Sequence, residues 1–309
     1  MDIFLQQILN GLVLGSIYAL IALGYTMVYG IMGLINFAHG EVVMMGAMVT
    51  ITVVTSLMGA GLNLPGPLLV LIGLLVAIPA CMLLGYTIER VAYRPLRNAP
   101  RLAPLITAIG LSIVLQQVAI LIWGRNYIPF PSILSHDTIE IFGASITVLQ
   151  IMIIVLCLVI MAGLLIMVEK TKLGRAMRAT SQNPAVAGLM GVNVNTIISS
   201  TFMLGSALGA VAGVMVATNY DQAHYYMGFL IGLKAFTAAV LGGIGNLGGA
   251  VAGGILLGII ESLGAGYIGT LTGGFLGSHY QDIFAFMVLI LVLIFRPSGL
   301  LGEKMADRA

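Results

Sequence analysis

The segment EKTKLGRAMRATSQNPAVAGLMGVNVN, residues 169–195, is a polar interruption between two long apolar runs. Residues 141–168 before it carry no charge, and residues 179–220 again carry none. Four of the thirteen Lys and Arg residues lie here, namely Lys170, Lys172, Arg175 and Arg178. A simple chain reversal needs only a handful of residues. We therefore predict an ordered element with about two helical turns, a break, and a short second helix that Pro184 opens and Asn183 caps.

The composition of the whole chain is typical of an integral membrane protein. Of its 309 residues, 60% are hydrophobic and 8% are charged, and the mean hydropathy is +1.09. Soluble domains carry about 25% charged residues, so a water-soluble fold of this length could not cover its surface. The forty glycines agree with this class, because glycine allows close contact between membrane helices. The net charge of +2 does not indicate a nucleic-acid partner, and membrane lipid is the expected surrounding.

Apolar runs long enough to cross a membrane, about 20 residues each, occur along the whole chain. The predicted spans are one in residues 3–40 with a re-entrant piece at its end, two in 42–88 separated by an uncharged turn at 59–67, one each in 105–124, 146–168 and 196–218, and one in 282–295. Residues 228–262 are a further apolar stretch, and GGIGNLGG at its centre is either a break between two half-spans or a tight hairpin. The first span starts without the basic region of a cleaved signal peptide. The loop at 125–145 contains TIEIFGASI, which predicts a small hairpin, and residues 264–280 are expected at the surface.

These runs predict an all-α polytopic membrane protein with about nine transmembrane helices. The number becomes eight or ten if a broken segment is re-entrant. A single transmembrane domain should occupy residues 1–309, without a soluble domain or an ATP-binding segment.

The basic residues predict the orientation of the chain. Residues 89–101 and 169–178 hold four each and the tail from Arg296 holds three, so eleven of the thirteen lie in these segments, and Arg125 and Lys234 are the others. Loops rich in Lys and Arg face the cytoplasm. The three segments and the C-terminus are therefore predicted to be cytoplasmic, and the 125–145 loop and the N-terminus external.

Two glycine patterns predict close helix packing. Gly205, Gly209 and Gly213 recur every four residues and share one helix face, and Gly245, Gly249 and Gly253 repeat the pattern. The sequence GGIGNLGG also matches the dinucleotide fingerprint G-x-G-x-x-G. That fingerprint requires a strand, a turn and a helix within a βαβ unit, whereas the flanks here are apolar runs of membrane length. Packing around a hinge is the favoured interpretation.

Ionisable residues inside the apolar runs are candidates for lining a solute path, because burying such groups in lipid costs several kcal/mol. They could instead be helix caps or interfacial anchors. Breaks in membrane helices also offer free backbone groups to a zwitterion, and GLINFAHGE and LGGIGNLGG are the best candidates for such breaks. The candidate path residues are Asn36, His39, Glu41, Lys234, Gly243, Gly245 and Glu261.

No catalytic or metal site is expected from the sequence. The histidines at 39, 136, 224 and 279 are scattered, and they form neither an H-E-x-x-H motif nor an i, i+4 pair. Cys81 and Cys157 lie inside apolar runs without the spacing of metal ligands, so we expect them to be small buried side chains.

Four motifs, in order along the chain, resemble those of one family. They are INFAHGE at 35–41, ERVAYRPLR at 89–97, GRAMRATSQNPAVAGLMGVNVN at 174–195 and FTAAVLGGIGNLGGAVAGG at 236–254. Together they look like the LivH-type permease family of bacterial branched-chain amino-acid ABC importers, and the similarity covers nearly the whole chain.

The resemblance implies a permease subunit in a bacterial inner membrane that carries leucine, isoleucine or valine. Its implied partners are a second permease subunit, two cytoplasmic ATP-binding subunits and an extracytoplasmic substrate-binding protein. The partner subunits bind the ATP, so this chain needs no cofactor and is not an enzyme. Residues 169–195 correspond to the ATPase-coupling loop of the family. The residues carried over by this likeness are Gly174, Arg175, Arg178, Ala179, Asn183, Ala187, Gly188, Gly191 and Asn193.

Three other functions remain open from the sequence. A related importer of urea or short-chain amides would have a similar permease. A secondary transporter or channel would work without partners, but the coupling-type segment disfavours it. A membrane-embedded enzyme is disfavoured because no nucleophile–base pair or paired acids are evident.

Overall fold

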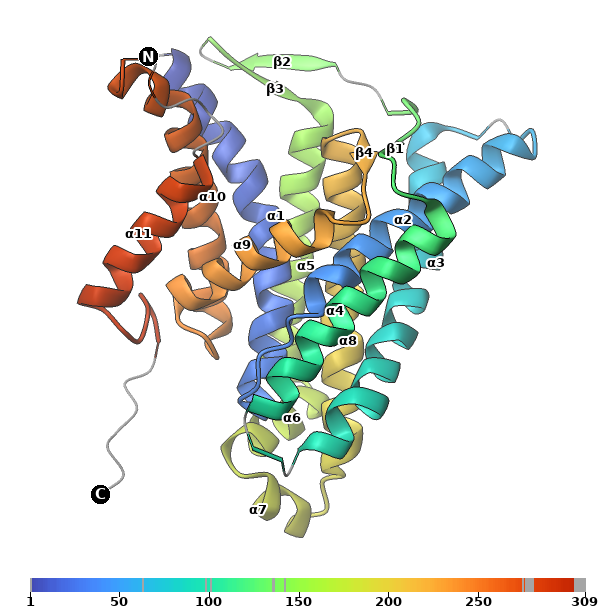
Figure 1. Cartoon of the computed structure of the whole chain (residues 1–309), viewed down its shortest axis with the longest axis vertical. Coiled ribbons are helices and arrows are strands. Elements are labelled where there is room, and N and C mark those ends of the chain that lie inside the picture. The colour runs from blue at the N-terminus through green and yellow to red at the C-terminus, as the bar shows by residue number, and fades with distance from the viewer. Residues whose placement is uncertain are drawn as a thin grey trace. The chain divides into compact units, whose positions relative to one another are not determined.

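The protein is mainly helical, as the computed structural model shows (Figure 1). The structure describes residues 2–62, 64–97, 99–100, 102–134, 137–141, 143–273, 275 and 281–302. Several residues named above lie outside the described residues, namely Arg101, His136, His279, Lys304 and Arg308.

The helices fall where the apolar runs predict them. Their bounds are α1 Asp2–Met32, α2 His39–Gly59, α3 Gly66–Thr87, α4 Leu102–Trp123, α5 Val148–Lys170, α6 Lys172–Gln182, α7 Pro184–Leu189, α8 Val194–Asn219, α9 Met227–Gly242, α10 Leu247–Leu271 and α11 Gln281–Phe295. A π-helix at Ile88–Tyr93 and a 3₁₀ turn at Arg94–Leu96 extend α3. The short strands are β1 Ile128–Pro129, β2 Thr138–Ile141, β3 Ala144–Thr147 and β4 Gln222–Ala223.

Among the described residues, seven helices are long and apolar enough to cross a membrane, and two shorter apolar helices lie at Met227–Gly242 and Phe286–Phe295. The seven long and two shorter apolar helices agree with the prediction of about nine, so the all-α polytopic fold is confirmed. The predicted hairpin is also present, because β2 and β3 pair antiparallel with Ile141 opposite Ala144. Cys81 and Cys157 are both buried.

One local prediction was wrong, and another is tested only in part. Residues 264–271, within the 264–280 segment expected at the surface, continue α10 and are mostly half-buried, and residues 276–280 lie outside the described part of the chain. The small side chains of residues 264–271 permit close packing, because a Cβ on Gly266 would contact the Gln7 side chain of α1. Gly245 has a φ of +100° and precedes α10, so it does not share a helix face with Gly249 and Gly253.

The contacts divide the chain into two compact units. Unit 1 comprises Met1–Thr26, His136–Met161 and Lys234–Ala309, and unit 2 comprises Met27–Ser135 and Ala162–Leu233. The boundaries at 26, 161 and 233 fall within α1, α5 and α9. The single transmembrane domain expected over the whole chain stays a prediction.

Unit 1 is held together by glycines that bring helix backbones into contact. A Cβ on Gly15 would meet the backbone of Ile255, and one on Gly258 would meet Gly15, so α1 and α10 touch without side chains between them. The α9–α10 loop holds the predicted break, and Asn246 caps α10 by accepting a hydrogen bond from Gly249 N at 3.0 Å. Leu300 N donates to Leu241 O at 2.9 Å, so the end of the described chain lies against this loop.

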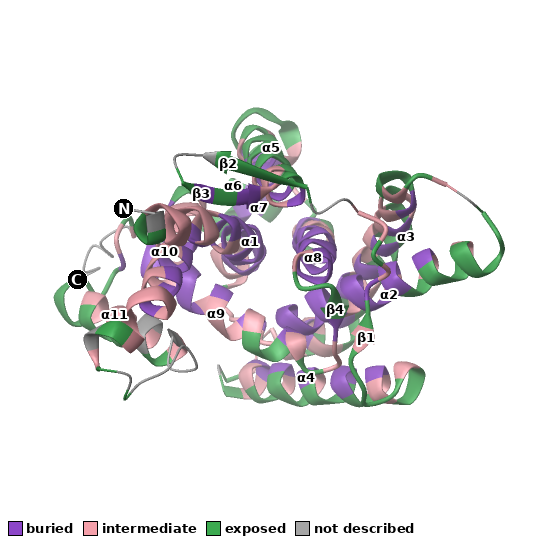
Figure 2. Cartoon of the chain, turned by 90° about the horizontal axis from the view of Figure 1, so that it is seen from above, coloured by how far each residue is buried: buried purple, intermediate pink, exposed green. Residues whose placement is uncertain are grey.

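Unit 2 is built around α8, which packs against α2 and α3. Most residues of α8 are buried, and Figure 2, which looks along this helix, shows it largely purple, whereas α4 carries exposed residues along one side. A helix rises 1.5 Å per residue, so the 26 residues of α8 span about 39 Å. Residues 190–193 connect α7 to α8 at one end, and β4, paired with β1, follows α8 at the other.

We expect Gly213→Ala to destabilise unit 2 and Gly209→Ala to be tolerated. A Cβ on Gly213 would collide with the carbonyl oxygen of Val43, whereas one on Gly209 would meet side chains at an ordinary 3.5 Å. Overpacking costs about 1–3 kcal/mol. Thermal unfolding of the purified protein in detergent measures the difference. Equal melting temperatures for the two variants would contradict a tight α2–α8 contact at Gly213.

Candidate functional site

The segment from Thr171 to Asn193 is ordered by side-chain caps at each helix start. Thr171 Oγ1 accepts a hydrogen bond from Gly174 N at 3.1 Å, and Asn193 Oδ1 accepts one from Thr196 N at 3.2 Å. Asn183 Oδ1 accepts from the backbone N–H groups of the second and third residues of α7, both at 3.1 Å. The predicted break and the Asn183 cap are confirmed, and α6, at 11 residues, is longer than the expected two turns.

Two of the carried-over motif residues fasten α6 to the end of α5. The guanidinium of Arg178 donates to Val168 O, and also to Glu169 O at 3.3 Å. These carbonyls belong to the last turn of α5, where the helix has no partners of its own for them. Gly174 is buried, and a Cβ there would collide with Val168 O. Both residues therefore fix the angle between α5 and α6.

The turn after α7 depends on a glycine. Gly191 has a φ of +86°, in the left-handed region where residues with a Cβ are strained. Its N–H donates to Gly188 O at 3.1 Å, and Val192 N donates to Ala187 O at 3.0 Å, so the last carbonyls of α7 are satisfied. The Ala187 side chain is only 4% exposed and lies on the inner face of α7.

Large apolar side chains of this segment are exposed. Leu189 is 87% exposed, Met190 is 80% exposed, and Val186 is also exposed. None of the three is among the residues expected from the sequence. Their signal was apolar side chains within a polar segment, which could have indicated a contact surface. Seven of the nine motif residues expected from the sequence are also exposed, and only Gly174 and Ala187 are buried. Of the exposed seven, Arg175, Ala179 and Gly188 neither cap a helix nor fasten the segment.

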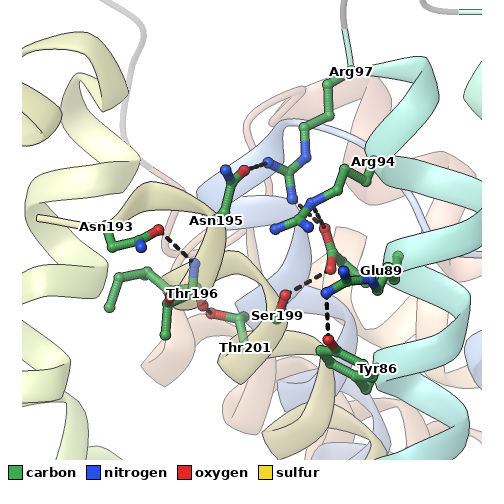
Figure 3. Close-up of polar contacts among 11 residues, drawn as sticks. Tyr86, Glu89, Arg94, Arg97, Asn193, Asn195, Thr196, Ser199 and Thr201 are labelled. Atoms are coloured by element: carbon green, nitrogen blue, oxygen red, sulfur yellow. Dashed lines mark hydrogen bonds and ion pairs between the residues drawn. The ribbon is translucent and has the colours of Figure 1, made fainter.

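A buried carboxylate joins the end of α3 to the start of α8 (Figure 3). Glu89 is fully buried; its Oε2 accepts a hydrogen bond from Ser199 Oγ at 2.6 Å, and its Oε1 accepts one from Arg97. Arg97 also donates to Asn195 Oδ1 at 2.5 Å, and Arg94 Nε lies 3.7 Å from Glu89 Oε1. The two basic segments of unit 2 thus lie at the same end of that unit, as the charge pattern predicts.

The candidate path residues of unit 2 are all buried. Asn36 Oδ1 accepts hydrogen bonds from Ala38 N and from the Tyr93 hydroxyl, each at 3.1 Å, and His39 begins α2. Glu41 Oε1 accepts from the hydroxyl of Ser112 at 2.9 Å and from the amide of Gln116 at 2.7 Å, both on α4. The other Glu41 oxygen, Oε2, accepts no hydrogen bond within the described part of the chain.

The candidate path residues of unit 1 form a separate group. Lys234 Nζ lies 2.6 Å from Glu261 Oε1 and 2.7 Å from Asp282 Oδ1, so one ammonium joins α9, α10 and α11. Asp282 is not among the residues expected from the sequence, although it is the acid that opens the last apolar run. Gly243 and Gly245 lie in the α9–α10 loop, both with positive φ. A place for either group in a translocation path stays a prediction.

Comparisons with known proteins agree over nearly the entire chain. A family model described as "Branched-chain amino acid transport system / permease component" matches residues 7–293. The chain is 45% identical to the high-affinity branched-chain amino acid transport system permease protein LivH of Escherichia coli K12, over 99% of this chain and 97% of that protein.

Two further relatives extend the comparison. The permease protein BraD of Pseudomonas aeruginosa is 45% identical over 99% of this chain and 98% of its own. A probable LivH of Methanocaldococcus jannaschii is 29% identical over 97% of this chain and 94% of its own. No solved structure matches. The resemblance carried by the four motifs is therefore confirmed, and the chain belongs to the family of branched-chain amino acid transport permease components.

Proposed function

We propose that the chain is the membrane-spanning permease subunit of an ATP-driven importer that carries leucine, isoleucine and valine across a bacterial inner membrane. The names of the relatives that are 45% identical over 99% of the chain support this cargo. A second permease subunit would complete the pore, and an extracytoplasmic binding protein would deliver the amino acid. Two cytoplasmic subunits would bind and hydrolyse ATP, so this chain would need no cofactor and would not itself be an enzyme.

The observation that carries the proposal is the capped α6–α7 segment with its exposed apolar side chains. Apolar side chains gathered in water next to basic residues are typical of protein interaction sites. Leu189 and Met190 are the most exposed of them, and Arg175 is also exposed. We assign this surface, together with Val186, Ala179 and Gly188, to contact with the ATPase. The remaining motif residues shape the segment, because they cap its helices, fasten it or turn the chain.

Movement of α7 would reach the membrane helices through fixed contacts. The contacts of Arg178 and Gly174 hold α6 on the last turn of α5, and Asn193 caps α8 three residues after Met190. Because each helix start is capped, a push on α7 displaces the ends of α5 and α8 instead of unwinding the segment. ATP-driven closure of the ATPase pair would supply that push.

The orientation follows from the same segment. The end of unit 2 with α6, α7 and the arginines at 90–97 would face the cytoplasm, together with the C-terminus. The opposite end, where β1 pairs with β4 and His224 Nε2 lies 3.1 Å from Arg125 O, would face the binding protein.

Buried ionisable groups within membrane segments usually mark solute paths. We therefore assign the two polar groups to the path, with the α9–α10 loop glycines as a backbone element. The free Oε2 of Glu41 supports this, since a buried carboxylate oxygen without a partner can receive a hydrogen bond from solute. The residues are Asn36, His39, Glu41, Lys234, Gly243, Gly245 and Glu261.

We expect Leu189→Glu to separate the permease from its ATPase subunits. A charge at the centre of an apolar contact costs about 2 kcal/mol or more, so co-purification of the ATPases should fall at least about tenfold. Leu62→Glu is the matched control, because Leu62 is an exposed leucine in the α2–α3 turn and should leave co-purification unchanged. Full ATPase recovery with Leu189→Glu would refute the docking surface.

We expect Gly188→Arg to abolish leucine uptake while the protein still inserts into the membrane. A Cβ on Gly188 meets no atom within 4 Å, so the side chain fits the isolated subunit and would obstruct only a partner. Ala187→Glu should also abolish uptake and coupling without preventing insertion, although it buries a charge on the inner face of α7. Normal uptake with Gly188→Arg would rule out contact at this helix.

We expect uptake of radiolabelled leucine only when the ATPase subunits and the binding protein are co-expressed. The test strain should lack its own branched-chain importers. Excess unlabelled valine or isoleucine should compete, whereas excess urea should not. Uptake without ATPase subunits would indicate a secondary transporter, and competition by urea would indicate the amide importer.

A further inference from the structure

We propose that the π-turn Ile88–Tyr93 is the joint through which α8 moves the turn at residues 36–38, with Glu89 and Tyr93 as its positioning residues. This inference rests on the proposed function, because it concerns how a displacement of α8 reaches the candidate path. All of the residues involved belong to unit 2.

The input side of the joint is the hydrogen bond between Ser199 and Glu89. It measures 2.6 Å, and both residues are buried. A hydrogen bond to a carboxylate is stronger than one between neutral groups, and a low dielectric strengthens it further. Ser199 lies six residues after Asn193, which caps α8 next to the docking segment. Any displacement of α7 that moves the start of α8 therefore pulls on Glu89.

A second contact fixes the rotation of α8 against the π-turn. Arg97 donates both to Glu89 Oε1 and to Asn195 Oδ1, the latter at 2.5 Å (Figure 3). Asn195 and Ser199 are four residues apart and lie on the same face of α8. Two attachment points on one face hold the helix in position and in rotation, which a single hydrogen bond could not do.

The output side of the joint is Tyr93, four residues after Glu89 in the same π-turn. Its hydroxyl donates to Asn36 Oδ1 at 3.1 Å, and its ring lies 5.2 Å from the ring of Phe202 on α8. Asn36 Oδ1 also accepts from Ala38 N at 3.1 Å, which shapes the turn immediately before α2. Glu41 follows in the first turn of α2. The contacts thus run without a gap from α8 to the candidate path.

The π-helix at Ile88–Tyr93 supports a functional role for this connection. A π-helix has i→i+5 hydrogen bonds, so each turn contains one residue more than a turn closed by the i→i+4 bonds of an α-helix. Single π-turns are rare, and they occur frequently at functional sites. Here the six residues Ile88–Tyr93 carry Glu89, which contacts α8, and Tyr93, which contacts both α8 and the 36–38 turn. The same wide turn therefore carries the input and the output.

The test compares Ser199→Ala with Thr201→Val in the complete transporter reconstituted in liposomes. Both variants remove one buried hydroxyl from α8. The hydroxyl of Ser199 reaches Glu89, whereas that of Thr201 donates to Ile197 O within α8 at 2.8 Å. Ser199→Ala should lower the leucine transported per ATP hydrolysed about tenfold, since a hydrogen bond to a charged group is lost. The Thr201→Val ratio should equal that of the wild type.

A second pair of variants tests the output side. Tyr93→Phe removes the hydroxyl that reaches Asn36, and Tyr86→Phe removes one that accepts from Arg90 at 2.6 Å on the exposed side of α3. Only Tyr93→Phe should lower the transport ratio. Both tyrosine variants should retain the ATPase subunits and the melting temperature of the wild type.

The outcomes separate the joint from a merely structural role. If Ser199→Ala and Tyr93→Phe lower the melting temperature and leave transport per ATP unchanged, the network only stabilises the fold and the proposal is overturned. A wild-type ratio in both variants at an unchanged melting temperature also overturns it, while the proposed function stands. Failure of the proposed function would appear differently, as wild-type liposomes that hydrolyse ATP without importing leucine.

Discussion

Direct contact between helix backbones is the interaction on which both units depend. Lipid is as apolar as the helices it surrounds, so association between membrane helices relies on close van der Waals packing. In unit 1 the contact runs through Gly15 and Gly258, and in unit 2 through Gly213. At each of these glycines a neighbouring helix lies in backbone contact, so the position of that helix is fixed. The polar side chains that the neighbouring helix carries are therefore also held in place.

Two groups of charged side chains inside these units pair with one another. Lys234 lies between Glu261 and Asp282, and Glu89 is surrounded by Arg97 and Ser199. Removing one partner of a buried pair leaves the other charge uncompensated, which is strongly destabilising. The network around Glu89 has a further property that the Lys234 group lacks in unit 1. It begins beside the α6–α7 segment, because Asn195 and Ser199 follow closely after the Asn193 cap of α8.

Local signals made much of the fold predictable from the sequence. The lengths of the apolar runs predicted about nine spans, and the sequence TIEIFGASI predicted the β2–β3 hairpin. Asn183 followed by Pro184 predicted the start of α7. Contacts between distant segments could not be predicted. Glu89 meets Ser199 across 110 positions, and Glu41 meets Gln116 across 75. The sequence also could not show which face of α7 is buried, because a helix of six residues is too short to display a periodic pattern. In the structure Ala187 is buried and Leu189 is exposed.

The caps of the α6–α7 segment bear on how it would meet a partner. Its two helices start on the Thr171 and Asn183 side chains, and Asn193 caps α8 directly after it. A segment that is already ordered loses little conformational entropy on binding, so more of the contact energy remains as affinity. A disordered segment would instead order and melt with each ATPase cycle. In the proposed importer, such pre-organisation would let the few exposed side chains alone set association with the ATPase and release from it, at a speed governed by diffusion and not by local folding.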